Sequence, residues 1–464
     1  MRSNLLDQSE RNVKIYFDNS LPKMAEIVIR ELGLEVLAGG TALRDTSGRL
    51  CFYASIELGD EQRVLLTAAL TQELGEYARK DRVIAGVGEF GVKDALNSSD
   101  ARVVELDSTS VRLIDRRLVG ADWLRAPVAR TAGAPRFVFA SLKGGVGRST
   151  ALSVVAAHAA ARGRRVLVVD LDLEAPGLGA MLLDRETTPQ FGIIDALVER
   201  ALAPLDPAFL ADLVSASTLT NRGRIDVVPA FGARSLANPA DILAKIGRAY
   251  GEVIHEDGSI ETMLDQISAI IQAVEESNRY DLVLVDARAG LHETAAAALL
   301  GLGAEILCFG IDEPQTFHGY RALFSHMNRY AKSKAAENDW FARISLVQAK
   351  APLDAALRSD FARRCQQMLS ESDRASDGNG RNEVPLPDGF SDVAWDETVS
   401  DAELGLTDIT AAVEVLAVTY DNTFANFAPL RVRDQISEAA YMLTYGALLK
   451  YIDQGLIRAE VIPR

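Results

Sequence analysis

The sequence predicts an α/β protein with a mostly parallel sheet flanked by helices, preceded by a smaller α+β domain. Two observations support this fold class. After about residue 135, several short runs are continuously apolar and rich in valine, isoleucine and leucine, as in strands buried on both faces of a parallel sheet. Helix-like stretches separate these runs, and strands alternating with helices are typical of parallel α/β folds.

The charge balance, the apolar runs and the cysteines of the sequence exclude several classes of protein. The 464 residues include 49 Lys and Arg against 65 Asp and Glu, a net charge of −16. This balance argues against broad nucleic-acid binding, which depends on neutralising phosphates. No 18-residue apolar run predicts a membrane span, and the first residues lack the apolar core of a signal peptide. The sequence has only three cysteines, which predicts a cytoplasmic location. They are widely spaced, so no cysteine metal site is expected.

Residues 1–133 are expected to form the smaller α+β domain. The patterns predict strands at 13–17, 50–58 and 81–87 and helices at 22–34 and 61–79. The basic stretch 112–130 is either a docking helix or a packed connector. We find no catalytic constellation in this domain, so a regulatory or partner-binding role is the expectation.

A glycine-rich turn opens the second domain, residues 134–464. It follows a predicted strand at 137–140 and precedes a predicted helix at about 149–161 that Gly163 ends. Strand, glycine turn and helix together suit phosphate binding, because backbone N–H groups and the helix N-terminus can surround an anion. A turn that merely joins strand and helix is the alternative. The predicted phosphate-binding residues are Lys143, Gly144, Gly145, Val146, Gly147, Arg148, Ser149 and Thr150, with the Ser149 hydroxyl also a Mg²⁺ ligand.

Carboxylates end two further apolar runs. Asp170 and Asp172 follow the predicted strand at 165–169, and Asp286 ends the one at 280–285. Ligands bind at the carboxyl ends of parallel strands, so these side chains are expected near the glycine turn. Asp286 has the position of a Walker B carboxylate, which holds Mg²⁺ through water. The alternative for a single such aspartate is a hydrogen bond within its loop.

The three motifs, KGGVGRST, DLD and DARAGL, resemble those of the ParA/MinD-type P-loop ATPases (deviant Walker A, SIMIBI class) over residues 135–350. The resemblance implies a P-loop NTPase sheet that binds ATP and Mg²⁺. It also implies that Asp172 orients the attacking water, that Asp170 lies near Mg²⁺, and that Lys143 reaches phosphate across a dimer. Arg288 stands near a proline position of the family, and either faces phosphate or forms a surface ion pair.

The rest of the second domain carries weaker patterns. Strands are predicted at 224–228, 305–309 and 344–348, and residues 235–278 are expected to be mostly helical. A polar insertion is expected around 370–382, and residues 384–397 resemble a strand and loop near the nucleotide base. The last helix, about 436–454, has little basic excess, which indicates core packing rather than a membrane anchor.

The resemblance implies a Mg-dependent, slowly hydrolysing ATPase that acts as a dimerisation switch. Its expected partners are a second copy of itself, bound in an ATP-dependent homodimer, and a protein docked through residues 1–133. Slow turnover is expected because Arg148 replaces the usual P-loop lysine, and a guanidinium does not fill the space of an ammonium. One alternative is a catalytically weak nucleotide-binding scaffold in a defence or signalling assembly. Another is a DNA-segregation ATPase, which the acidic charge disfavours.

Overall fold

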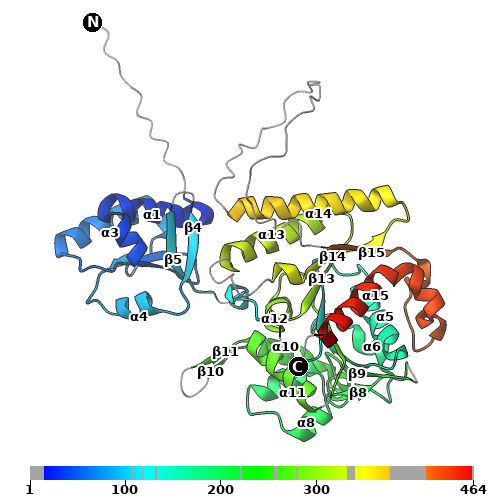
Figure 1. Cartoon of the computed structure of the whole chain (residues 1–464). Helices are drawn as coiled ribbons and strands as arrows, with labels where there is room; N and C mark the ends of the chain where they lie inside the picture. Colours follow the sequence, from blue (N-terminus) through cyan, green and yellow to red (C-terminus); the bar gives the residue numbers. More distant parts are fainter. Residues whose placement is uncertain are drawn as a thin grey trace, which may run out of the picture. The chain divides into compact units, whose positions relative to one another are not determined.

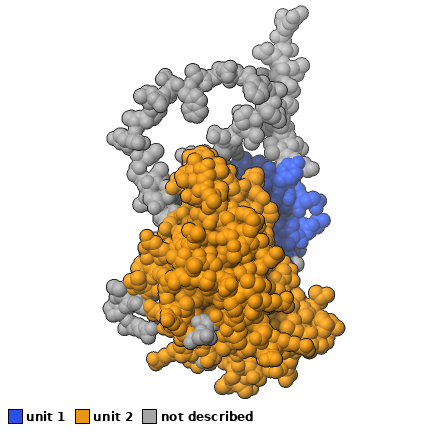
Figure 2. Space-filling view, turned by 90° about the vertical axis from the view of Figure 1, so that its right-hand side faces the viewer, with its two compact units in different colours: residues 1–119, 376–380 blue, residues 120–375, 381–464 orange. Residues whose placement is uncertain are grey.

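The chain divides into two compact units (Figures 1 and 2). Unit 1 comprises residues 1–119 with 376–380, and unit 2 comprises 120–375 with 381–464. This computed structural model describes residues 15–106, 109–117, 119–130, 133–219, 222–254, 259–277, 279–331, 340–376 and 414–461.

Unit 1 is an α+β unit built on a five-stranded sheet of order β3-β2-β1-β5-β4. The two central strands, β1 and β5, are parallel, whereas β2 and β4 run antiparallel to them. Cys51, Tyr53 and Ile114 lie in a core cluster of this unit. Its elements are α1 (Phe17–Leu32), α2 (Leu34–Gly39), β1 (Thr41–Arg44), β2 (Leu50–Tyr53), α3 (Asp60–Leu74), β3 (Ile84–Ala85), α4 (Val92–Asn97), β4 (Arg102–Leu106) and β5 (Thr109–Asp115).

One strand prediction for the first 130 residues is wrong. Phe17 begins α1 rather than ending a strand, because the Asn19 side chain caps the helix by accepting from the Tyr16 N–H at 2.7 Å. Residues 13 and 14 lie outside the described residues. Of the two alternatives for the stretch 112–130, the structure shows the connector: its described residues contain the end of β5 and one 3-10 turn, Asp122–Leu124.

Residues 120–130 pack within unit 2, although the sequence assigns them to the N-terminal domain. Asp122 accepts a hydrogen bond from the Leu264 N–H at 2.9 Å, and Trp123 lies in the main core of unit 2. A long-range contact of this kind leaves no signal in the local pattern.

Unit 2 is built on an eight-stranded sheet of order β15-β14-β13-β6-β12-β7-β9-β8. Its strand pairs are all parallel except β8–β9, which confirms the predicted mostly parallel sheet. The strands are β6 (Arg136–Ser141), β7 (Arg165–Asp170), β8 (Ser215–Ala216), β9 (Arg224–Val228), β12 (Leu282–Asp286), β13 (Glu305–Gly310), β14 (Ile344–Ala351) and β15 (Glu414–Thr419).

Helices cover both faces of this sheet (Figure 1). In β6, Phe137 and Phe139 pack on the face that contacts α5 and α15, whereas Val138 and Ala140 pack on the opposite face with α11 and α12. A strand buried on both faces must be apolar throughout, which explains the continuous runs. The helices are α5 (Arg148–Ala161), α6 (Leu178–Leu182), α7 (Ile193–Arg200), α8 (Pro207–Ala211), α9 (Ala233–Ala237), α10 (Ile242–Ala249), α11 (Met263–Ser277), α12 (Glu293–Gly301), α13 (Pro314–Ala331), α14 (Ala355–Ser376) and α15 (Glu438–Val461).

The C-terminal third differs in part from the sequence expectation. Residues 370–376 continue α14 and are not a loop; the remainder of the expected insertion, and the strand-like stretch 384–397, lie outside the described residues. The last helix, α15, packs in the core through Leu448, Leu449 and Ile452. No helix within the described ranges is long and apolar enough to cross a membrane. Residues 235–278 contain the small β10 (Val253–Ile254) and β11 (Ile260–Glu261) hairpin between helices.

Candidate functional site

The glycine turn lies between β6 and α5, at the carboxyl end of a central strand. Gly145 and Gly147 have φ angles of 73° and 92°, a left-handed backbone that favours glycine, and Gly147 is the N-cap of α5. A Cβ added to Gly144, Gly145 or Gly147 would meet no atom within 4 Å, so the space over the turn is open. A 14-residue helix starting here adds a favourable dipole for an anion.

Arg148 points into the protein and lies against the predicted carboxylates. Its Nε donates to Asp286 in a close contact, its Nη1 donates to the Ser141 Oγ at 3.0 Å, and its Nη2 donates to Asp172 at 3.3 Å. The residue is only 7% exposed. Burial alone would lower the pKa of Arg148, but the charges of Asp286 and Asp172 outweigh it and raise this pKa. Arg148 is therefore the internal counter-charge of the site.

Asp286 joins the glycine turn to the sheet. Its Oδ2 accepts from the Ser149 Oγ at 2.5 Å, and its other oxygen accepts from Arg148. Asp286 is the register partner of Phe139 in β6 and of Asp170 in β7, so three strand ends meet here. Burial raises the pKa of Asp286, and Arg148 only partly offsets that effect.

The two aspartates after β7 have different surroundings. Asp170 is fully buried and accepts from two backbone groups of its own loop, the Asp172 N–H at 3.0 Å and the Leu178 N–H at 3.2 Å. Burial, followed by repulsion from Asp286, raises the pKa of Asp170 to about 8. Asp172 faces Arg148 instead. The sequence could place both at the strand end but not tell which one faces the site.

Lys143 and Arg288 both form ion pairs near this edge of the sheet. The Lys143 Nζ lies 2.6 Å from Glu313 Oε2, with both side chains 44% exposed. Arg288 pairs with Glu174, which follows β7, so of the two roles left open by the sequence the structure shows the ion pair.

The residues present fit a magnesium ion beside bound phosphate. Mg²⁺ prefers oxygen ligands and is commonly held by one or two carboxylates with phosphate and water. The Ser149 hydroxyl and the Asp286 carboxylate supply such oxygens next to the open glycine turn. In the described part of the chain, no group of three or more His, Cys, Asp or Glu forms a metal cluster, and such a site does not need one.

Two residues at this edge were not predicted. Ser141 ends β6 and accepts from Arg148, and Glu174 pairs with Arg288. Glu174 stands two positions after Asp172, so its place in the same loop could have indicated a residue of the site. No sequence feature indicated Ser141.

Comparisons with known proteins find solved structures of low sequence identity and one family model. Comparison with curated proteins finds no significant relative. Among solved structures, a putative plasmid partition protein from Borrelia burgdorferi B31 bound to AMPPNP is 14% identical, with 70% of this chain and 99% of that chain covered and a TM-score of 0.40. The cell division ATPase MinD of Pyrococcus furiosus is 17% identical, with 69% and 99% covered and a TM-score of 0.39. A ParA family ATPase from Chlorobium tepidum TLS is 18% identical, with 51% and 82% covered and a TM-score of 0.35.

A family model gives the assignment for the central part of the chain. The model of the CobQ/CobB/MinD/ParA nucleotide binding domain matches residues 137–287, from the first strand of unit 2 to the residue after Asp286. This segment contains the glycine turn and all three predicted carboxylates. Residues 137–287 are therefore similar to the CobQ/CobB/MinD/ParA nucleotide binding domain.

Proposed function

We propose that the protein binds ATP with Mg²⁺, hydrolyses it slowly, and uses the bound nucleotide as a dimerisation switch that controls a partner protein. One observation carries the proposal. An open glycine turn at a helix N-terminus lies in direct contact, through Arg148 and Ser149, with the carboxylate that ends β12. In a nucleotide-binding domain, this places anion-binding and cation-binding groups side by side.

Each residue of the site has a role in the proposal. Backbone N–H groups from Gly144 to Thr150 bind the phosphates. Ser149 and Asp286 hold the metal, and Asp170 lies near it. When bound, Mg²⁺ would supply charge neutralisation at the phosphates. Asp172 orients the attacking water, which requires its release from Arg148.

Arg148 gives a physical reason for slow turnover. Its ion pairs with Asp286 and Asp172 engage the two carboxylates that the reaction needs. Nucleotide binding must exchange these contacts for contacts with phosphate, and the exchange costs part of the binding energy. The same locked arrangement favours one alternative, a nucleotide-binding scaffold with negligible turnover.

Dimerisation is proposed because Lys143 forms its ion pair with Glu313 at the surface, outside the glycine turn. An exposed ion pair of this kind contributes only about 0–1 kcal/mol, so Lys143 can leave it to contact phosphate bound by a second copy. Nucleotide bound between two copies would then complete both sites.

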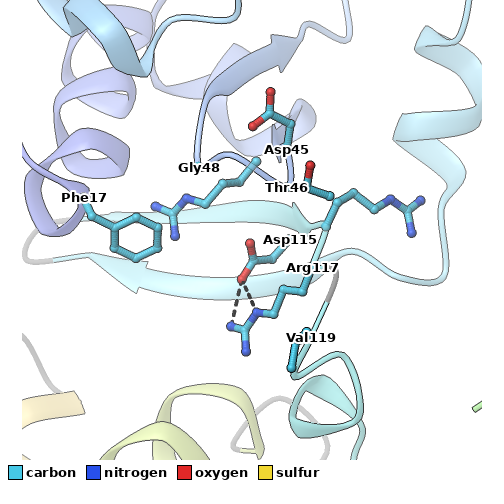
Figure 3. A pocket seen from close by; sticks show the side chains of 9 residues that line it. Phe17, Asp45, Thr46, Gly48, Asp115, Arg117 and Val119 are labelled. Atoms are coloured by element: carbon cyan, nitrogen blue, oxygen red, sulfur yellow. Dashed lines mark hydrogen bonds and ion pairs between the residues drawn. The ribbon is translucent and has the colours of Figure 1, made fainter. Parts of the chain in front are cut away.

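The partner is proposed to bind unit 1. A hollow of about 330 Å³ lies at the carboxyl ends of the parallel strands β1 and β5 (Figure 3). Phe17, Thr46 and the Asp115–Arg117 ion pair line it, together with Arg44 and Arg116. Arg117 pairs with Asp115, Arg116 pairs with Asp100, and Arg44 lies over the Phe17 ring, 4.2 Å from its centroid. A partner would therefore meet guanidinium and carboxylate groups around an aromatic ring.

The test combines turnover and solution mass. ATP hydrolysis is measured for the parent protein and for Asp172→Ala, and light scattering compares Asp172→Ala without nucleotide, with Mg-ADP and with Mg-ATP. We expect the variant to lose hydrolysis and to double in mass with Mg-ATP alone. Unchanged hydrolysis in the variant contradicts the role of Asp172. An unchanged mass contradicts the switch, and absence of turnover in the parent with ATP binding retained supports the scaffold.

A further inference from the structure

A bidentate ion pair joins the two loops that follow the carboxylate-bearing strands. Arg288 lies two residues after Asp286, and Glu174 lies two residues after Asp172. The Arg288 Nη1 is 2.6 Å from Glu174 Oε1, and its Nη2 is 2.5 Å from Oε2. The side chains are 22% and 36% exposed, so the pair is partly shielded from water. Bidentate geometry fixes both the distance and the orientation of the partners.

A third element supports the pair. The hydroxyl of Tyr250, the residue that follows α10, donates to Glu174 Oε1 at 3.0 Å and lies 3.4 Å from Arg288 Nη1. The Tyr250 ring packs against the His292 ring, with centroids 4.8 Å apart. Burial raises the pKa of Tyr250, so its hydroxyl keeps its proton and remains a donor.

The loop that carries Arg288 is fixed to the sheet on either side of it. The Ala287 N–H donates to the Phe139 oxygen at 3.0 Å, and the Gly290 N–H donates to the Ser141 oxygen at 2.8 Å. Gly290 has a φ of 91°, which favours glycine and sets the direction of the chain. Arg288 is therefore held at a defined place beside the glycine turn.

The loop that carries Glu174 is fixed at its two ends. Asp170 accepts from the N–H groups of Asp172 and Leu178, which bracket the loop. Glu174 lies between these points, and Arg288 and Tyr250 contact it there. Within the same loop, Asp172 Oδ1 accepts from the Ala175 N–H at 3.3 Å. Contacts with Glu174 therefore act next to a backbone group that holds the Asp172 side chain.

We propose that Arg288 and Tyr250 are positioning residues that act through Glu174 to hold Asp172 in place for water activation. The inference rests on the proposed ATP hydrolysis for its kinetic consequence, and it assigns Arg288 no contact with phosphate. It predicts an effect on turnover rather than on nucleotide affinity, because none of these three residues belongs to the glycine turn.

The experiment compares the full-length parent with Arg288→Ala, Tyr250→Phe and the charge exchange Arg288→Glu with Glu174→Arg. We expect Arg288→Ala to lower kcat about tenfold, as a small misplacement of a reacting group does, with KM and ATP affinity changed less than about twofold. Tyr250→Phe lowers kcat by a smaller factor, and the charge exchange restores part of the loss. If Arg288→Ala instead lost ATP affinity, and the charge-exchange variant did not recover it, Arg288 would contact phosphate. That result would overturn the proposal.

A second readout does not depend on turnover. Hydrogen–deuterium exchange of the nucleotide-free protein should become faster in residues 171–178 of Arg288→Ala. Arg200→Ala is the matched control, because Arg200 forms a similar ion pair with Glu261, 2.5 Å long and partly buried, elsewhere in unit 2. Equal exchange in residues 171–178 of Arg288→Ala and the parent overturns the proposal. If Arg288→Ala shows faster hydrogen–deuterium exchange but the parent protein does not hydrolyse ATP, the contact between the two loops is supported. Only the proposed hydrolysis is then refuted.

Discussion

Arg148→Met should destabilise unit 2 strongly, in a pH-dependent way. The substitution removes the guanidinium and leaves Asp286, which is 1% exposed, without its counter-charge. A buried carboxylate in this position becomes protonated rather than remaining charged. Protonation costs about 1.4 kcal/mol for each unit between its ordinary pKa of about 3.9 and the solution pH. Because burial already raises the pKa of Asp286 in the parent, the loss relative to the parent is at most about 4 kcal/mol at pH 7 and about 1.5 kcal/mol at pH 5.

The sign of the pH dependence follows from linkage. In the variant the folded pKa of Asp286 lies above its unfolded value, so the folded state binds the extra proton. Its stability relative to the parent is thus highest at low pH and falls as the pH rises. The estimate agrees with the loss of about 3–5 kcal/mol that usually follows removal of one partner of a buried ion pair.

Urea unfolding followed by tryptophan fluorescence measures this effect. Trp123 and Trp340 are buried in unit 2, and the sequence has no tryptophan before residue 123. With a denaturant slope of about 3 kcal/mol/M, the midpoint should fall by at most about 1.4 M at pH 7 and at most about 0.5 M at pH 5. The control is Arg148→Met with Asp286→Asn, which removes both charges and should recover most of the loss. A loss below about 1 kcal/mol, or one that does not change with pH, would refute the reasoning.

Two further predictions concern α5. Gly147→Ala should lower the folding stability by about 1 kcal/mol and weaken ATP binding, because Gly147 has a φ of 92°. Gly144→Ala is the control, since Gly144 has no positive φ. Equal effects of the two substitutions on thermal stability would contradict the prediction. His158→Gln should reduce the loss of stability between pH 7.5 and 5.5. Burial lowers the pKa of His158, and the Arg162 guanidinium, 2.8 Å from its Nδ1, adds to this effect although Asp453 opposes it. As the pH falls below about 6.5, the unfolded chain therefore takes up the proton first, and the folding stability of the parent declines. Unfolding midpoints that decline equally in the parent and in His158→Gln would contradict this prediction.

Prediction from sequence succeeded where the physical signal is local. A strand buried on both faces must be apolar along its length, so β6, β7, β12, β13 and β14 could be recognised directly. Unit 1 was harder, because strands such as β1 have four residues and mixed polarity. Its arrangement depends on which strands pair, and a short strand carries little information about its neighbours.

For the site, the sequence by itself determined the glycine turn between strand and helix and the carboxylates at the strand ends, since each feature belongs to one continuous segment. Only the tertiary structure decided how the charges pair. Arg148 contacts Asp286 across 138 positions of the chain, and Arg288 contacts Glu174 across 114. The physical reason is that β12 lies between β6 and β7 in the sheet although it follows both in the sequence. Electrostatic interaction depends on distance in space, and the order of the strands sets that distance.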